Sequence, residues 1–123
     1  MKTVRVLNAG TGRAVLEEAE VAEGAWARFR GLMGRKGLPA GRGLIIPGCH
    51  GIHTCFMRFA MDAVYLDGGG RIVRIVDAMK PWRLSWCRGA KSVLEMTSGA
   101  AKAAGLKPGD VLAFQPLDPA RPA

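Results

Sequence analysis

Residues 61–77 read MDAVYLDGGGRIVRIVD, and this stretch predicts the most regular part of the fold. Its first seven residues alternate well enough for a strand, and the run Asp67-Gly68-Gly69-Gly70 is typical of a hairpin turn. Residues 71–77 supply the partner strand, in which most side chains are isoleucine or valine. The stretch therefore predicts an antiparallel β-hairpin, and the other elements are assigned outward from it.

Short apolar segments continue on both sides of this hairpin. The chain has 17 glycines and seven prolines, which favour turns and short strands over long helices. Residues 13–21 are predicted as a strand, although their alanine, leucine and glutamate would also suit a helix. Further strands are predicted at 4–8, 44–46, 92–96 and 111–114.

Two short helices are also predicted. In residues 25–34 the apolar side chains recur every three or four positions, so Trp26 and Phe29 are expected to face the core. A second helix follows the strand at 92–96, and Thr97 or Ser98 can cap it.

Together these elements predict a single α+β domain over residues 1–115. About seven short strands would curl into a partly closed, barrel-like sheet with two short helices against it. Residues 116–123 contain three prolines and little apolar content, which predicts a frayed tail.

The charge balance indicates the kinds of partner that the protein would attract. Eighteen Lys and Arg against ten Asp and Glu give a net charge of +8, which favours nucleic acid, anionic lipid or phosphorylated ligands. The densest basic segment, residues 28–42, contains no acidic residue. An ordinary cationic surface with no such partner would have the same composition.

The cysteines and the hydropathy indicate the compartment. Cys49, Cys55 and Cys87 are odd in number and form no C-x-x-C unit, which favours free thiols in a reducing compartment. No apolar run is long enough to span a membrane, and the first residues alternate charged and apolar types, unlike a signal peptide. We therefore expect a cytoplasmic protein.

A cluster of soft ligands lies at Cys49, His50, His53 and Cys55. If the chain is extended from residue 52 onward, His53 and Cys55 share a face with Met57, as a copper(I) site would require. Structural zinc sites usually use two separated pairs of ligands, and these residues also suit an ordinary core. We predict no metal and no cofactor.

A second group of residues is polar. Asp62 interrupts an apolar stretch, so its carboxylate needs a partner, for which Arg58 and His53 are the candidates. Trp82 and Arg83 follow in a loop, where the tryptophan could stack on a ring or cover the core. The group would be either a structural ion pair or a pocket that holds an anion.

The stretch IHTCFMRFAMDAVYLD at residues 52–67 resembles the hallmark of a prokaryotic family, domain-of-unknown-function family 192, which reads roughly IHTFFMRFPIDVVFLD. Residues 30–35, 80–83, 90–95 and 106–112 agree as well. The resemblance implies a compact β-rich domain and no particular activity. It places the family's polar motif positions at His53, Thr54, Arg58, Asp62, Glu95 and Asp110.

Two positions depart from the family pattern. Cys55 stands where the family has an aromatic residue, so it is not a family-wide ligand. Ala60 replaces a proline, which loosens the turn before the strand that contains Asp62.

The leading functional hypothesis is a small binding module for an anionic or polar ligand. Its expected site consists of six residues: His53, Thr54, Arg58, Asp62, Trp82 and Arg83. A nucleic-acid-associated protein that uses residues 28–42 with Lys80 and Arg83 is the alternative. A hydrolase-type enzyme with His53 as general base oriented by Asp62 ranks last, because no nucleophile motif supports it. The sequence leaves open whether the protein catalyses a reaction, and in which oligomeric state it exists.

Overall fold

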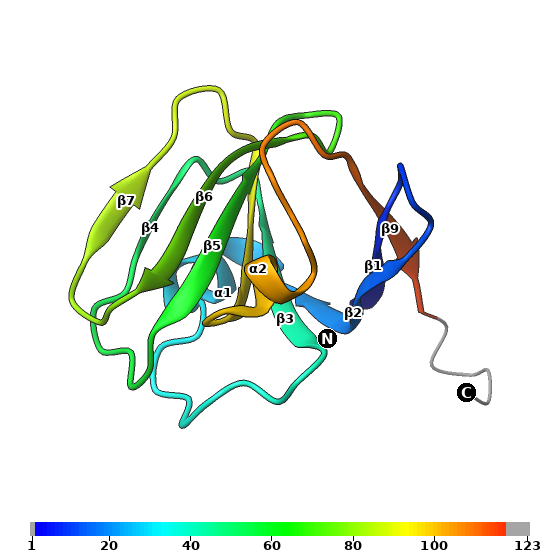
Figure 1. Cartoon of the computed structure of the whole chain (residues 1–123). Helices are drawn as coiled ribbons and strands as arrows, with labels where there is room; N and C mark the ends of the chain where they lie inside the picture. The colour runs from blue at the N-terminus through cyan, green and yellow to red at the C-terminus, as the bar shows by residue number, and fades with distance from the viewer. Residues whose placement is uncertain (1, 118–123) are drawn as a thin grey trace.

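Nine strands and two short helices make up residues 2–117, the part of the chain that the computed structural model describes (Figure 1). In chain order they are β1 (Thr3–Asn8), β2 (Ala14–Val21), α1 (Gly24–Arg30), β3 (Arg42–Pro47), β4 (Gly51–His53), β5 (Met61–Leu66), β6 (Ile72–Met79), β7 (Leu84–Trp86), β8 (Ser92–Thr97), α2 (Ala100–Ala103) and β9 (Leu112–Pro116).

Seven of the strands form one sheet in the order β6-β5-β8-β3-β2-β1-β9, and β4 pairs with β7 in a separate two-stranded sheet. Residues 14–21 are a strand, so the helical alternative for them is wrong. The predicted count of about seven strands omits β4 and β7. At three residues each, these two strands are too short to show a periodicity.

The predicted hairpin is confirmed. β5 and β6 run antiparallel, with Val64 opposite Ile75. In the turn between them, the side chain of Asp67 accepts hydrogen bonds from the backbone N–H groups of Gly69 and Arg71, both at 2.9 Å. The carboxylate thus replaces backbone partners that the turn cannot supply.

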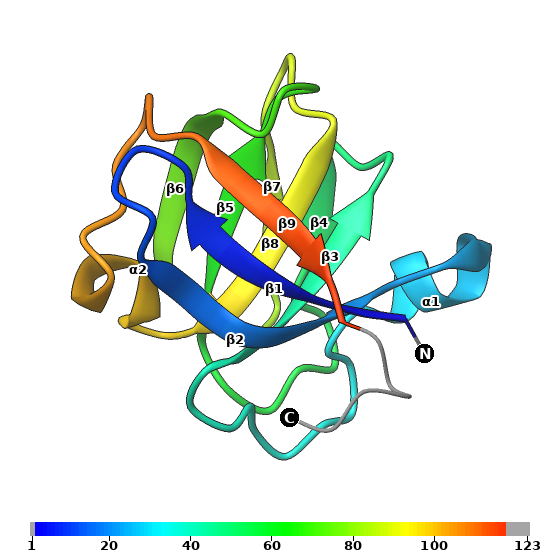
Figure 2. The ribbon, with the colours of Figure 1, turned by 90° about the vertical axis from the view of Figure 1, so that its right-hand side faces the viewer.

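The large sheet is not closed into a barrel. Its two edge strands are β6 and β9, and a single antiparallel bridge from Arg71 to Val111 joins them at one corner. Figure 2 shows β9 beside β1, and in Figure 1 β9 stands at the right, apart from β6. The predicted β-rich α+β fold is therefore found, and the predicted partial closure is not confirmed.

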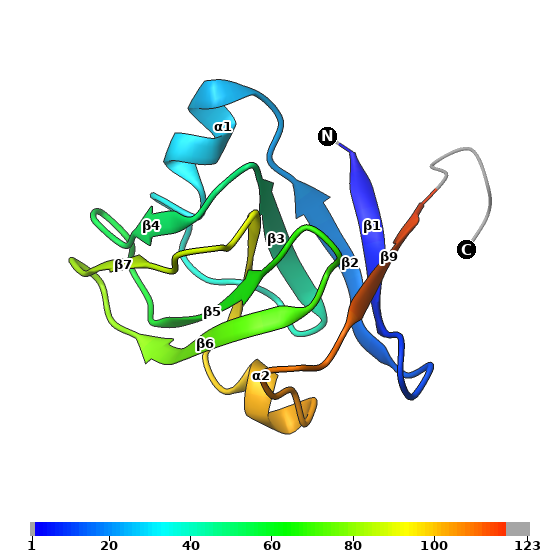
Figure 3. The same cartoon turned by 90° about the horizontal axis from the view of Figure 1, so that it is seen from above.

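The core lies on both faces of this sheet. Because side chains alternate along a strand, Val64 and Leu66 of β5 pack with Ala101 of α2, whereas Met61 and Tyr65 pack on the other face. Ala27 of α1 and Ile52 of β4 lie on that second face. In the view from above, α1 and α2 are on opposite sides of the sheet (Figure 3).

The prediction that Trp26 and Phe29 belong to the core is wrong. Trp26 is 69% exposed and Phe29 is 57% exposed, whereas Leu32 is buried. The helix ends at Arg30 because Gly31 takes a positive φ of 51°. The chain therefore turns before Leu32, which reaches the core from a turn, and the aromatic side chains stay outside.

Residues 52–59 do not form one extended segment. Strand β4 ends at His53, and the chain turns through Phe56, whose φ is 64°. The predicted common face of His53, Cys55 and Met57 therefore does not exist.

Of the predicted tail at 116–123, Pro116 is the last residue of β9, and residues 118–123 lie outside the described residues.

Candidate functional site

The predicted site residues are not gathered in one pocket. Asp62, on β5, is fully buried and faces α2. Its Oδ2 atom accepts a hydrogen bond from the backbone N–H of Ala101 at 3.0 Å, and Oδ1 accepts one from Ala78 at 2.8 Å. The predicted cap of α2 by Thr97 or Ser98 is wrong. Gly99 takes the cap position and forms no side-chain bond. The free N–H of Ala101 in the first turn of α2 instead donates to Asp62, which lies on β5.

His53 lies on the other side of the sheet from Asp62. It ends β4, which packs on the α1 face, and its Nε2 atom is 3.2 Å from the backbone oxygen of Phe29. The pairing of His53 with Asp62, on which the enzyme hypothesis depended, is therefore wrong. Asp62 faces the α2 side of the large sheet, whereas β4 lies outside that sheet and packs on its α1 side.

Thr54 positions the loop between β6 and β7. Its hydroxyl donates to the backbone oxygen of Lys80 at 2.6 Å and accepts from the N–H of Arg83 at 2.8 Å. The backbone oxygen of Thr54 accepts a further bond from Trp82 at 3.0 Å. Thr54 is fully buried, so these bonds fix the loop against β4.

Trp82 and Arg58 are both exposed. The Trp82 ring is 59% exposed and meets the edge of Phe56, with ring centroids 4.7 Å apart, so it does not cover the core. The backbone at Trp82 has a φ of 64°, which is costly for a bulky residue and depends on the Thr54 bonds. Arg58 does not line the pocket described next.

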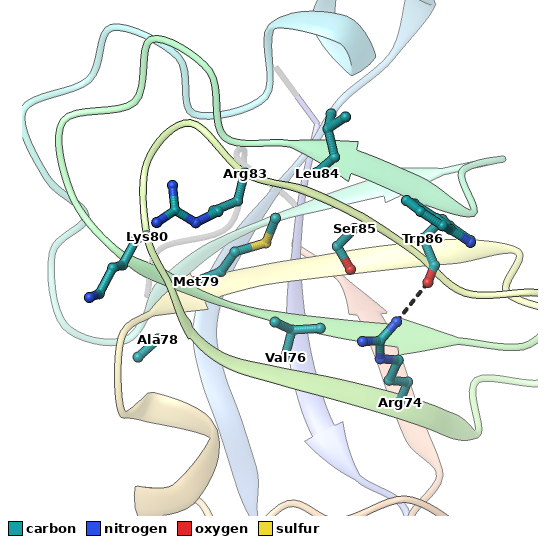
Figure 4. A pocket seen from close by; sticks show the side chains of 9 residues that line it. All are labelled: Arg74, Val76, Ala78, Met79, Lys80, Arg83, Leu84, Ser85 and Trp86. Atoms are coloured by element: carbon teal, nitrogen blue, oxygen red, sulfur yellow. Dashed lines mark hydrogen bonds between the residues drawn. The ribbon is translucent and has the colours of Figure 1, made fainter.

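Arg83 lines a groove of about 650 Å³ between β6 and β7, at the edge of the large sheet (Figure 4). Lys80 and Arg83 lie at one end, and Arg74 lies at the other near Trp86, with apolar side chains between them. We call this the basic groove; it is lined by Arg74, Val76, Ala78, Met79, Lys80, Arg83, Leu84, Ser85 and Trp86.

Of the described residues that line the basic groove, three are cationic and none is acidic. Among residues 2–117, none of Arg74, Lys80 and Arg83 forms a salt bridge. Arg74 spans the groove, since its Nη1 atom donates to the backbone oxygen of Trp86 at 2.8 Å. Its other N–H groups are left for a ligand. The groove is therefore chemically suited to an anion.

The floor of the basic groove is fixed from below. The hydroxyl of Tyr65, on β5, donates to Ser85 Oγ at 2.9 Å and ties β7 to the large sheet. Burial raises the pKa of Tyr65 above its ordinary value of 10, so the hydroxyl stays protonated and keeps its role as donor. This bond holds the short strand β7 in place beside β6.

Sequence reasoning found part of this groove. It named Arg83 and Lys80 from the break after the hairpin, but it missed Arg74. The only available signal was that Arg74 interrupts the apolar run of the strand predicted at residues 71–77. That signal does not say which face of the strand is exposed.

A second cavity, of about 250 Å³, lies between the end of α1 and β4. Glu95 of β8 projects into this region from the sheet and is 2% exposed. We call it the Glu95 cavity; its lining is Arg28, Phe29, Arg30, Gly31, Ile46, Gly48, Cys49, Gly51, Ile52, His53 and Glu95. His53 is thus the one predicted site residue that it contains.

Glu95 is electrostatically unusual. Burial raises the pKa of its carboxyl from 4.5 to about 7, and the positive charge of Arg35 opposes this only in part. Within the described part of the chain, Glu95 Oε2 has no hydrogen-bond partner, and neither does His53 Nδ1. Buried polar atoms without partners are rare and costly, so this cavity requires an explanation.

The soft-ligand cluster does not assemble. In the described range 2–117, no three His, Cys, Asp or Glu side chains are grouped so that they could hold a metal ion. All three cysteines are free and half-buried. Cys49 Sγ donates to the backbone oxygen of Gly51 at 2.8 Å, and burial raises the pKa of this thiol, which keeps it protonated.

The basic segment at residues 28–42 is partly neutralised by strand β2. Arg35 pairs with Glu20 at 2.7 Å, and Arg42 pairs with Glu18 at 3.1 Å. These acidic partners lie outside the segment in the sequence, so its composition alone overstates its surface charge.

Between residues 2 and 117, no helix is long and apolar enough to cross a membrane.

Comparisons with known proteins agree with this architecture. UPF0127 protein TK1120 of Thermococcus kodakarensis is 27% identical over 118 residues, which cover 92% of this chain and 74% of that protein. A crystal structure from Sinorhizobium meliloti 1021, provisionally described as a transcription regulator, superimposes with a TM-score of 0.80 at 26% identity, covering 92% of each chain.

A crystal structure of a protein of unknown function from Novosphingobium aromaticivorans DSM 12444 has the same fold. It superimposes with a TM-score of 0.77 at 23% identity and covers 90% of this chain and 83% of that one. The model of the family described as "Uncharacterized ACR" matches residues 5–114. Since that match takes in nearly all the strands, the chain belongs to domain-of-unknown-function family 192.

Proposed function

We propose that this protein is a binding module that takes a small anionic ligand in the basic groove. The observation that carries the proposal is the set of three cations, Arg74, Lys80 and Arg83, in a groove with no acidic side chain. A net charge of +8 would draw an anion toward the surface, and the groove would give it a defined seat.

The groove is organised before any ligand arrives. Thr54 holds the loop that presents Lys80 and Arg83, and Tyr65 holds β7 through Ser85. A site whose donors are already positioned costs less ordering entropy on binding. The apolar floor formed by Val76 and Met79 strengthens the interaction of a charged group with the three cations, because it excludes water from one side.

Nucleic acid is the less favoured ligand. The relative from Sinorhizobium meliloti is provisionally described as a transcription regulator, which is the reason to test it. Against it, two of the arginines in the basic segment 28–42 already pair with Glu18 and Glu20. Phosphate contacts to a duplex would need these guanidinium groups free.

The test is an NMR titration of the ¹⁵N-labelled protein with inorganic phosphate and with citrate at low salt. We expect saturable shifts at the backbone amides of Arg83 to Trp86. Arg74→Gln and Arg83→Gln should each weaken binding about tenfold, because each removes a charge-assisted hydrogen bond. Arg58→Gln is the matched control: it removes the same charge outside the groove, and affinity should stay unchanged.

Two results would contradict this proposal. One is that Arg58→Gln lowers affinity as much as Arg83→Gln, which would mean a diffuse effect of net charge. The other is that neither anion shifts the groove resonances while a DNA duplex does, which would favour the nucleic-acid alternative.

A further inference from the structure

The Glu95 cavity holds polar atoms that the basic groove does not use. Glu95 and His53 come from different strands, β8 and β4, and line the same space below the end of α1. In residues 2–117, neither Glu95 Oε2 nor His53 Nδ1 has a hydrogen-bond partner, although both are buried. A fold built only for stability would use apolar side chains here, since unpartnered polar atoms destabilise it.

The bond to Phe29 determines what His53 can do in the cavity. A backbone oxygen only accepts, so the contact of 3.2 Å between His53 Nε2 and Phe29 O places the proton on Nε2. A ring protonated only at Nε2 presents Nδ1 as an acceptor. Glu95 Oε2 is a second buried atom without a partner in residues 2–117. A ligand that satisfies His53 Nδ1 has to carry a donor.

The charges around the cavity restrict the ligand further. An anion such as phosphate would bring its negative charge against the buried carboxyl group of Glu95. A cation would have to approach Arg28 and Arg30, which line the cavity. The guanidinium of Arg28 lies close over Gly48, where a Cβ atom would stand 3.1 Å from Nη1. Hydroxyl groups avoid both conflicts, since they donate to Glu95 and His53 and accept from Arg28.

An exposed aromatic surface adjoins this polar interior. Phe29 lines the cavity and packs on the His53 ring, with the two ring centroids 5.1 Å apart. The Trp26 ring in turn packs on Phe29, with centroids 5.9 Å apart. Both aromatic side chains are more than half exposed. An apolar wall beside a few convergent polar groups is the usual composition of a small-molecule site. The C–H groups of a polyhydroxylated ring would pack on such a wall.

The backbone is fitted to Glu95 at this point. At Gly31, whose φ is positive, a Cβ atom would lie 3.1 Å from Glu95 Oε1. Any other residue at this position would press on the carboxyl group as well as strain the turn. The short helix α1 thus ends with a glycine that leaves room for the acid.

We propose that the Glu95 cavity is a second binding site, which takes a small uncharged ligand with several hydroxyl groups, of the size of a monosaccharide. The site is separate from the basic groove and has a different ligand chemistry. The carboxyl pKa of about 7 supports this assignment, because at neutral pH the group both donates and accepts, as hydroxyl partners require.

The test is an NMR titration with neutral sugars as probes: D-glucose, D-galactose, D-mannose and myo-inositol. We expect at least one of them to shift the backbone amides of Gly31 and His53 and the Trp26 indole in a saturable manner. Glu95→Leu keeps a side chain of similar size without polar atoms, and His53→Phe keeps the ring against Phe29. Each should weaken binding at least tenfold.

The basic groove supplies the matched controls. Arg83→Gln should leave sugar binding unchanged, and Glu95→Leu should leave phosphate binding in the groove unchanged, so either site can fail without the other. The proposal is overturned if none of the four probes shifts the cavity resonances. It is also overturned if Glu95→Leu and His53→Phe, both folded, bind the sugar as the wild type does, or if phosphate is the probe that shifts these resonances.

Discussion

Two buried carboxyl groups on neighbouring strands show how differently one sheet can treat the same chemistry. Asp62 of β5 lies opposite Met96 of β8, and Glu95 of β8 lies opposite Ala63 of β5, one step along the ladder. Each is at most 2% exposed. Asp62 accepts two backbone hydrogen bonds, whereas Glu95 Oε2 has no partner in residues 2–117.

The difference follows from what covers each face. On the α2 face, the short helix and the end of β6 point free N–H groups at Asp62. On the α1 face, the chain above Glu95 turns away at Gly31 and leaves a cavity. Burial therefore does not by itself indicate the role of an acid; its partners do. Asp62 stabilises the fold through its two hydrogen bonds, and Glu95 Oε2 makes none among the described residues.

The largest expected effect is at Asp62. Asp62→Ala leaves the N–H groups of Ala78 and Ala101 without their acceptor, and the free energy of unfolding should fall by about 4 kcal/mol. Urea denaturation monitored by circular dichroism measures it. Glu95→Ala is the comparison: it removes no hydrogen bond and should cost distinctly less. Equal losses for the two variants would mean that the bonds to Asp62 do not matter.

The next effect is the pH dependence that Glu95 imposes. Its folded pKa is about 7, and that of the ordinary carboxyl is 4.5. Between these values the folded state keeps a proton that the unfolded state has released, so stability falls as pH rises. The unfolding free energy of Glu95→Gln minus that of the wild type should therefore increase by about 3 kcal/mol as the pH rises from 4.5 to 7. Below pH 4.5 and above pH 7 the difference should be constant.

Denaturation curves at several pH values measure this difference directly, because every other group titrates in both proteins. Glu23→Gln provides the matched control, since it makes the same substitution at an exposed side chain. A Glu95→Gln profile parallel to that of the wild type from pH 4.5 to pH 7 would show that the carboxyl group is not desolvated.

The smallest expected effect concerns the backbone that Asp62 holds. Ala78 has a φ of 49° and donates its N–H to Asp62. Ala78→Gly relieves this conformation and should raise the unfolding free energy by about 1 kcal/mol. Ala14→Gly, at an exposed position of strand β2, should change it in the opposite direction. Thermal denaturation of both variants tests the sign, and a loss at Ala78 would contradict the assigned strain.

The predictability of the fold depended on the length of its elements. The hairpin of β5 and β6 was predictable because two long, mostly apolar runs flank a glycine-rich turn. The strands β4 and β7 were not, because three residues carry no period. The early end of α1 at Gly31 was missed, and with it the exposure of Trp26 and Phe29. A glycine that ends a helix looks the same in the sequence as one within it.

The candidate site was less predictable for a topological reason. His53 and Asp62 are close in the sequence, and pairing them required only that both face the same way. The sheet order puts β8 beside β5 and leaves β4 on the other face, which a local pattern does not specify. Glu95 was named through the family motif but was not connected with His53, because their proximity is a property of the tertiary fold alone.

The pairing of β1 with β9 has a consequence for how the chain folds as it is synthesised. β1 is synthesised before the other described strands and finds its outer partner β9 only after residue 116 has emerged, so this edge of the nascent sheet stays open until then. Unpaired strand edges attract other chains. Such long-range pairing also makes folding slow. Protection of the β1 edge until β9 is available would therefore reduce such contacts.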